Sequence, residues 1–208
     1  MNRADLAWAL RAVLPHAAGG RNGVIGSEPL GNVTYFYATD HYTTGIARVN
    51  DYAGWCWQMS AKEATELMRF IRPERVADRA QEIVYVQLSQ ELHVGYGEGG
   101  QIEPVTAVFE TVEHEVKLET LIGFISQLND APVEWDELIY QPKVFERFTQ
   151  AEREKSGDRL RILPKHAIDR NGAAIVTVGS DFLGAIAGLT YDQEGPVNVA
   201  QFLALSAA

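Results

Sequence analysis

The residue types that most often carry catalysis or bind metals are scattered along this sequence. No two of the five histidines form a pair spaced for one helical turn. The single cysteine excludes an intrachain disulfide and a cysteine-based zinc site. The sequence therefore shows no nucleophile beside a base and no ligands at metal-binding spacing. The histidines are His16, His41, His93, His114 and His166, and the cysteine is Cys56.

Local context makes these residues structural. Cys56 lies between two tryptophans and is expected in a buried strand, and His114 lies between two glutamates and is expected in solvent. The glycine-rich run at 95–100 leads toward another strand, whereas a phosphate-binding loop leads into a helix, so a hairpin is expected. The acidic residues around Trp135 have no visible partner. We expect no catalytic residue, no metal and no cofactor.

Composition favours a folded domain or two. The chain has 208 residues, 46% of them hydrophobic, which is enough for one large or two small cores. No apolar run reaches the roughly 20 residues of a membrane span, and the first residues do not resemble a secretory signal, so we expect a cytoplasmic protein. A net charge of −10 argues against a protein that coats nucleic acid along its whole surface, but it permits a local basic face.

Periodicity predicts a helix, three strands, a second helix and three more strands. The first helix is expected at 5–14, ended by Pro15, and the second begins at a capping box, in which Ser60 and Glu63 satisfy each other's backbone donors. This element order is a twofold internal repeat. The strands are expected at 33–37, 46–50, 55–59, 83–88, 92–96 and 105–112, with glycines breaking the fifth.

The remaining sequence predicts a further helix and then a third unit. Apolar spacing from Leu118 to Ile125 indicates a helix that ends at 129–132. Pro142 suits the first turn of the next helix, and strands are expected at 160–163, 174–178 and 183–189. The fold class is therefore α+β, with repeated units of one helix and antiparallel strands.

Four segments resemble motifs of the bacterial DNA sliding clamps, the polymerase processivity factors. The segment from Ala38 to Gly45 resembles the Ala-Thr-Asp segment of the middle clamp domain, and Ser60 to Leu67 is similar to a helix start in that domain. Tyr140 to Phe145 is similar to the helix start of the last domain, and Val176 to Gly184 resembles its closing strand pair. The resemblance implies helices on one face of the sheets, lining a ring. It divides the chain into a clamp-like domain at 1–113 and a second, shorter one at 114–208.

The resemblance also implies which residues meet duplex DNA. A clamp holds the duplex through its phosphates, without reading sequence, by cationic side chains on the lining helices. An ordinary solvated helix face explains any single one of these residues equally well. The candidates are Arg3, Arg11, Lys62, Arg69, Arg72, Lys143 and Arg147.

Partner proteins of clamps insert a peptide between the middle and last domains, and the resemblance places that pocket here too. The family's Arg-Leu is replaced by Thr43-Thr44 and its terminal Met-Pro-x-Arg-Leu is changed, so the pocket is expected to be altered. The segment 201–205 loosely resembles a clamp-binding peptide and gives the hypothesis of a self-plug, with a packed C-terminal element as the alternative. The pocket candidates are Thr39, His41, Tyr42, Thr43, Thr44, Phe182, Leu183, Ala187, Gly188 and Leu189.

The sequence thus favours a non-enzymatic sliding clamp that encircles duplex DNA as a homo-oligomer and tethers a DNA polymerase or other replication proteins. One alternative is a clamp homologue that does not encircle DNA and acts as a protein-binding or regulatory module. Another is an enzyme on an unrelated α+β fold, which a deep pocket with perturbed carboxylates or histidines would favour.

Overall fold

The computed structural model describes residues 1–17, 23–51, 54, 56–71, 82–98, 101–102, 107–132, 142–153, 157–165 and 173–187. Helices and antiparallel strands alternate in groups, which confirms the α+β class. The elements are α1 (Arg3–Val13), η1 (Leu14–His16), β1 (Val24–Leu30), β2 (Val33–Thr39), β3 (Thr43–Val49), β4 (Trp57–Ser60), α2 (Ala61–Ile71), β5 (Glu82–Leu88), β6 (Glu91–Glu98), β7 (Gln101–Ile102), β8 (Ala107–Glu110), α3 (Leu118–Asp130), α4 (Pro142–Thr149), β9 (Leu160–Lys165), β10 (Ala173–Val178) and β11 (Phe182–Ile186).

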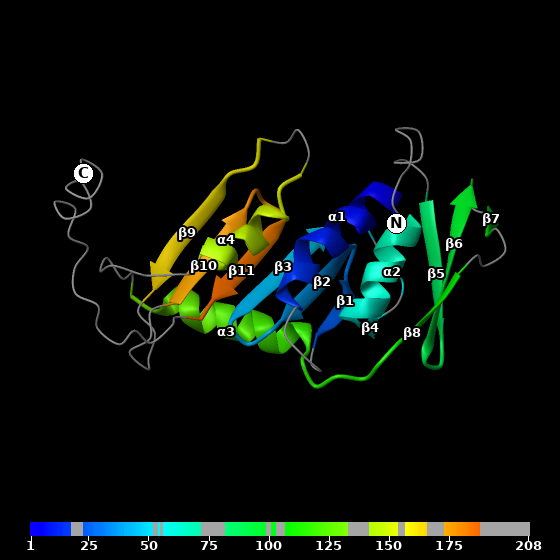
Figure 1. Ribbon diagram of the computed structural model, residues 1–208, viewed down its shortest axis with the longest axis horizontal. Helices are drawn as coiled ribbons and strands as arrows, with labels where there is room; N and C mark the ends of the chain where they lie inside the picture. Colours follow the sequence, from blue (N-terminus) through cyan, green and yellow to red (C-terminus); the bar gives the residue numbers. More distant parts are fainter. Residues whose placement is uncertain are drawn as a thin grey trace, which may run out of the picture.

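The strands form two antiparallel sheets. The larger has the order β4-β1-β2-β3-β11-β10-β9, and the smaller contains β5, β6, β7 and β8 (Figure 1). In the larger sheet, β3 pairs with β11, from Ala47 opposite Phe182 to Thr43 opposite Ile186. Strands from the two ends of the chain therefore share one continuous sheet.

Strand β1 was not expected from the sequence. It contains Gly26 and Pro29, two residue types that lower strand propensity, yet it pairs with β2 on one side and β4 on the other. The tyrosine ring of Tyr37 lies where a side chain at Gly26 would be, because an added Cβ would come within 2.2 Å of that ring. Tertiary packing thus explains both the glycine and the strand.

A twofold internal repeat is present as expected, with a constant offset of 58 residues, but its strands are grouped differently, because the unexpected β1 is the equivalent of β5 and β4 precedes α2. Helices α1 and α2 begin at 3 and 61, strands β1 and β5 at 24 and 82, and strands β2 and β6 at 33 and 91. The intervening hairpin turns both contain a residue with positive φ, Gly31 at 62° and Ser89 at 57°. The β1–β2 and β5–β6 pairings keep the same register, since Ile25 lies opposite Ala38 and Ile83 lies opposite Tyr96.

The two repeats are related by a local twofold axis. Met59, in the strand before α2, pairs with Ile25 of β1. Met1, just before α1, exchanges both backbone hydrogen bonds with Ile83 of β5, at 2.7 and 3.2 Å. Exchanging each residue with its equivalent 58 positions away converts one pair into the other. Each unit therefore completes the sheet of the other. Unit 1 is defined as α1 to β3 and unit 2 as β4 to β8.

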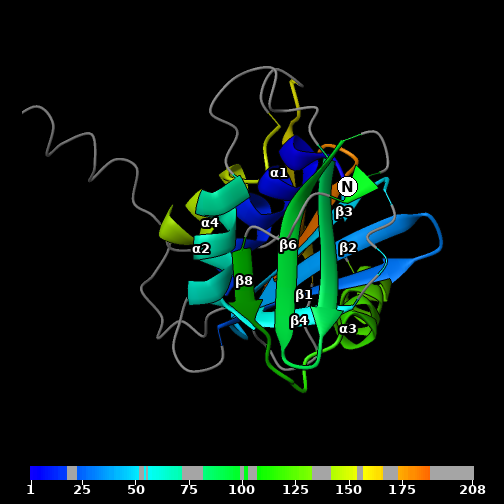
Figure 2. The same cartoon turned by 90° about the vertical axis from the view of Figure 1, so that its right-hand side faces the viewer.

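Three helices lie on one face of the large sheet and one lies on the other. Helices α1, α2 and α4 share a face, whereas α3 lies across the opposite face (Figure 2). The expectation that the helices share one face is therefore corrected for α3. Its apolar side chains cover Tyr37, Ile46 and Ile175, which the other helices cannot reach. The side chains of α3 that do so are Leu118, Leu121, Ile125 and Leu128.

Local expectations are corrected at three positions. Cys56 is exposed, because β4 begins only at Trp57, which takes the inward position. Strand β6 runs through Gly95 and Gly97 without a break, and Glu98 pairs with Gln101 in a hairpin. Ser60 Oγ accepts the Glu63 N–H at 3.1 Å as predicted, but the Glu63 carboxylate accepts the Glu110 N–H.

Candidate functional site

The helix face formed by α1, α2 and α4 is more cationic than the rest of the chain. The three helices together carry six Lys and Arg against four Asp and Glu, a net charge of +2 in a chain of net charge −10. The cations are Arg3, Arg11, Lys62, Arg69, Lys143 and Arg147, and the anions are Asp5, Glu63, Glu66 and Glu146.

Four of these cations are accessible to different degrees. Lys62 and Lys143 are exposed, and Arg69 is exposed but forms an ion pair with Glu66. Arg11 is half-buried and donates from Nη2 to the Glu152 carbonyl at 3.0 Å. The side chains with the greatest freedom to meet a phosphate are thus Lys62 and Lys143.

Two other predicted DNA contacts are bound within the fold. Arg3 is only 8% exposed, donates from Nε to the Ile71 carbonyl at 2.7 Å and stacks over the Tyr96 ring. Arg147 binds Asp40 and the Thr43 hydroxyl. Both residues join elements of the structure, so we leave them out of the proposed DNA surface. Arg72 lies outside the described residues.

Asp40 organises the turn between β2 and β3 and ties it to α4. Its Oδ1 accepts the Thr43 N–H at 2.7 Å and the Tyr42 N–H at 3.0 Å, while its Oδ2 binds the Arg147 guanidinium. Burial opposes ionisation of Asp40, but the Thr43 amide and Arg147 outweigh it, and the pKa of the carboxyl is lowered. The aspartate of the Ala-Thr-Asp motif is therefore a structural link across the β3–β11 junction.

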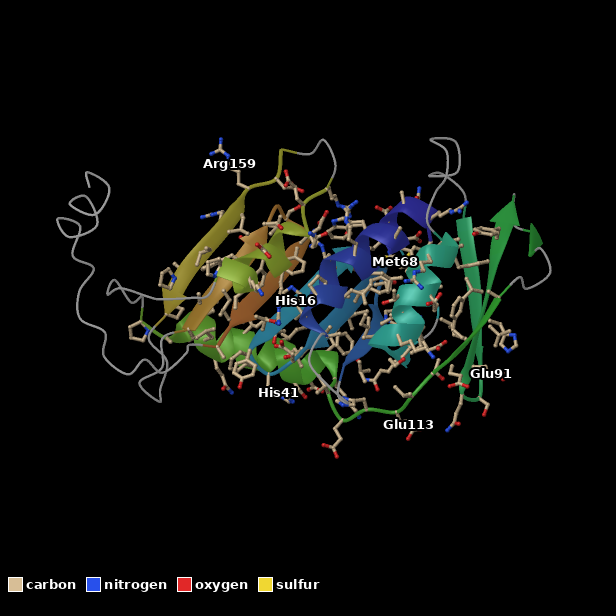
Figure 3. The ribbon with its side chains drawn as sticks, in the orientation of Figure 1. His16, His41, Met68, Glu91, Glu113 and Arg159 are labelled. Carbon is tan, nitrogen blue, oxygen red and sulfur yellow. The ribbon has the colours of Figure 1, made fainter. Side chains whose placement is uncertain are left out.

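His16 is buried at the same junction. Its ring lies 4.7 Å from the Phe148 ring and 5.8 Å from the Phe182 ring, at the end of α1 beside α4 (Figure 3). Neither ring nitrogen has a hydrogen-bond partner among the described residues. Burial, helped by the nearby Arg147 charge and opposed by Asp40, lowers the pKa of His16 to about 3. The histidine is therefore neutral at physiological pH.

The predicted peptide-pocket residues do not share one surface. Neighbouring residues of a strand point to opposite faces, so Phe182 packs with His16 on the helix face, whereas Leu183 packs under α3. Thr43 and Thr44 are buried and alternate in the same way, since Thr43 binds Arg147 and Thr44 binds Thr39.

The remaining pocket candidates lie at the edge of the junction. Tyr42 and His41 are exposed on the turn after β2, and His41 has a positive φ of 71°. Ala187 is half-buried and donates its N–H to the Tyr42 carbonyl at 2.8 Å. Gly188, Leu189 and the plug segment 201–205 lie outside the described residues.

A small pocket does open on the α3 face, next to the start of that helix. It includes Thr39, which was predicted, and His114, which was expected in solvent but is half-buried. The His114 N–H donates to Gln58 Oε1 at 2.8 Å, and its Nδ1 accepts the Val116 N–H at 3.1 Å. The sequence spacing of these residues does not predict that they line one pocket, because they come from three strands and a loop. The lining residues are Val24, Tyr37, Thr39, Gln58, His114 and Val116.

In the described parts of the chain, no three His, Cys, Asp or Glu side chains come together as metal ligands. None of the helices described is long and apolar enough to cross a membrane.

Solved structures resemble this fold over almost its whole length. A protein described as a DNA polymerase III beta subunit from Eubacterium rectale matches 93% of this chain, with a TM-score of 0.65 and 11% identity. The sliding clamp of Bacillus subtilis matches 92% with a TM-score of 0.62 and 10% identity. The Helicobacter pylori beta clamp, bound to a DNA ligase peptide, matches 95% with a TM-score of 0.58 and 9% identity. The chain has the sliding-clamp fold.

The likeness to sliding clamps is one of structure and covers part of those proteins. This chain spans 65% of the Eubacterium rectale chain, 63% of the Bacillus subtilis chain and 66% of the Helicobacter pylori chain. No protein-family model and no curated protein sequence matches it. The sliding-clamp fold therefore rests on the arrangement of repeated units.

Proposed function

We propose that the chain is a non-enzymatic DNA sliding clamp that encircles duplex DNA as a homo-oligomer. The observation that carries this proposal is the shared face of α1, α2 and α4, which is backed by continuous sheets and leaves Lys62 and Lys143 exposed in an acidic chain. A closed ring cannot leave the duplex sideways, so weak phosphate contacts from a few lysines suffice and sliding is not opposed by strong binding.

Chain length suggests how such a ring is built. The described residues form three helix-and-strand units, and the resemblance to clamps implies about twelve in a ring, so four chains would close one. Strands β8 and β9 end the two sheets of the described structure and provide edges at which further chains can add. The closed ring would act in the cytoplasm with a DNA polymerase or other replication proteins.

The partner peptide of this clamp would bind on the α3 face. The Helicobacter pylori neighbour was solved with a DNA ligase peptide, which supports peptide binding as a property to test here. Because α3 covers the β3–β11 junction, we place the peptide at the pocket beside Thr39 and His114. Tyr42, 63% exposed at the nearby turn, would provide an aromatic contact.

The alternative function is a clamp homologue that binds proteins without encircling DNA. The observation that favours it is the loss of two of the expected cations, Arg3 and Arg147, to internal bonds. Such a protein would keep the sheets and the α3-face pocket but would not depend on the helix face.

Charge reversal on the helix face tests whether DNA contacts it. The double variant Lys62→Glu, Lys143→Glu is expected to weaken binding to duplex DNA of any sequence, because two phosphate contacts are lost from each chain. The slope of log K against log salt should become shallower by about 1.8 for each chain that contacts the duplex, near 0.9 per phosphate. Fluorescence anisotropy at several salt concentrations measures this.

A control places one such charge reversal on the opposite face. Lys117, exposed just before α3, is replaced with Glu and should leave both affinity and slope unchanged. An equal loss per reversed charge in both proteins would reflect net charge alone and would favour the alternative function.

A further inference from the structure

The third helix-and-strand unit, defined as α4 with β9, β10 and β11, has no mate among the described residues. In units 1 and 2 the first strand after the helix receives a strand from the mate: β1 receives β4, and β5 receives Met1. Strand β9 holds this position after α4, but in the described sheet it pairs only with β10. Unit 3 is thus half of the arrangement that units 1 and 2 make together.

The side chains of β9 show the same incompleteness. Ile25 of β1 and Ile83 of β5 are 0% and 1% exposed in the completed units. On β9, by contrast, Leu160, Ile162 and Leu163 are 37%, 40% and 39% exposed. An edge strand with apolar side chains on both faces is a surface that other strands pair with.

We infer that a second copy of this chain completes unit 3 through a twofold axis, pairing α4 with α4 and extending the sheet at β9. The twofold relation between units 1 and 2 favours a second copy over another partner, because each of these units is completed by a unit of the same design. In an isologous interface, two copies of unit 3 use the same surface, and each copy supplies the mate that the other lacks.

The apolar side chains of α4 suit this pairing. Helices α1 and α2 meet with the start of one near the end of the other, because Arg3 binds the Ile71 carbonyl. Two α4 helices packed in this way would cover the half-buried Val144 and Phe145 of each copy.

This inference deepens the proposed ring, since it identifies the other copy that meets one of its two edges, but it does not depend on DNA. Chains would associate in pairs, so a closed assembly has an even number of chains. The β9 interface would be present whether or not the assembly encircles a duplex.

Solution mass tests the inference in the full-length protein. Light scattering after gel filtration should give an even multiple of the 23.0-kDa chain. Ile162→Lys should halve that mass, because a charge is placed in the interface of an edge strand that remains folded. Leu30→Lys is the matched control, since Leu30 is 63% exposed at the β1–β2 turn and should leave the mass unchanged. A monomeric wild-type protein, or an Ile162→Lys protein of unchanged mass, would overturn the inference.

Crosslinking tests the symmetry even where Ile162→Lys disturbs folding. In a Cys56→Ser background, Glu146→Cys should be joined to the same residue of the second copy by a short bismaleimide. Lys62→Cys, exposed on α2, should not be. Equal crosslinking at both positions, or at neither, contradicts a twofold pairing at α4. If Ile162→Lys halves the mass but the wild-type protein does not remain on circular DNA, this inference is retained and the proposed function is rejected.

Discussion

Replacing Asp40 with alanine is expected to lower the free energy of unfolding by about 3 kcal/mol, the range measured when one partner of a buried ion pair is removed. The Asp40 side chain is only 8% exposed and accepts from two backbone amides of its turn as well as from Arg147. The substitution leaves both amides without their acceptor and leaves the guanidinium with only the Thr43 hydroxyl, so the turn and α4 should loosen together. Urea denaturation followed by circular dichroism measures the change.

Two further variants separate this link from general charge effects. Asp51→Ala removes a carboxylate that is 43% exposed and 3.5 Å from the N-terminal amine, and it should cost under about 1 kcal/mol. Combining Asp40→Ala with Arg147→Met should cost less than the sum of the two, by about 1–2 kcal/mol, because the partners are in contact. Additive losses would show that Asp40 acts only within its own turn.

Acid is expected to destabilise the protein well before its carboxylates are protonated, because His16 is buried without charge. The pKa of His16 is lowered from 6.5 to about 3 in the folded chain. Between these values the unfolded chain binds a proton that the folded chain excludes. The contribution of neutral His16 to the free energy of unfolding is therefore fully present above pH 6.5. It decreases as the pH falls, by about 2–3 kcal/mol at pH 4.5. The Asp40 carboxyl has its pKa below 3.8, so it contributes only at lower pH.

The variant His16→Leu should remove this acid sensitivity while keeping the site apolar. Its free energy of unfolding is expected to be nearly constant from pH 6.5 to 4.5, measured by urea denaturation at each pH. His41→Leu is the matched control, because His41 is exposed on a turn and should leave the wild-type pH profile in place. A His16→Leu protein that still loses stability over this range would place the acid sensitivity elsewhere.

The parts of the fold predicted from sequence are those with local signals. The Ser60 cap and Pro142 placed two helix starts correctly, and alternating apolar residues placed β2, β5 and β10. Strand β1 was missed because Gly26 and Pro29 argue locally against a strand, and only pairing on both sides makes it one. The position of α3 could not be predicted, since its apolar stripe fits either face of the sheet.

The candidate site was predicted less well, because the sequence does not show which way each side chain points or which side chains are buried. Phe182 and Leu183 were assigned to one pocket, although the side chains of neighbouring residues in a strand point to opposite faces of the sheet. Arg3 was taken for a surface cation because nothing in the sequence shows that the end of α2 and the Tyr96 ring enclose it. The Asp40–Arg147 link joins residues 107 positions apart, and no local pattern connects them.

Retention on circular DNA tests the central claim most directly. Chains separated at high salt would be brought to low salt together with a circular plasmid, so that rings can close around the duplex without a loading protein. We predict that the protein co-elutes with the circular plasmid in gel filtration and is lost when the plasmid is cut once. Equal retention on circular and linear DNA, or retention on neither, would contradict the account of this chain as a sliding clamp.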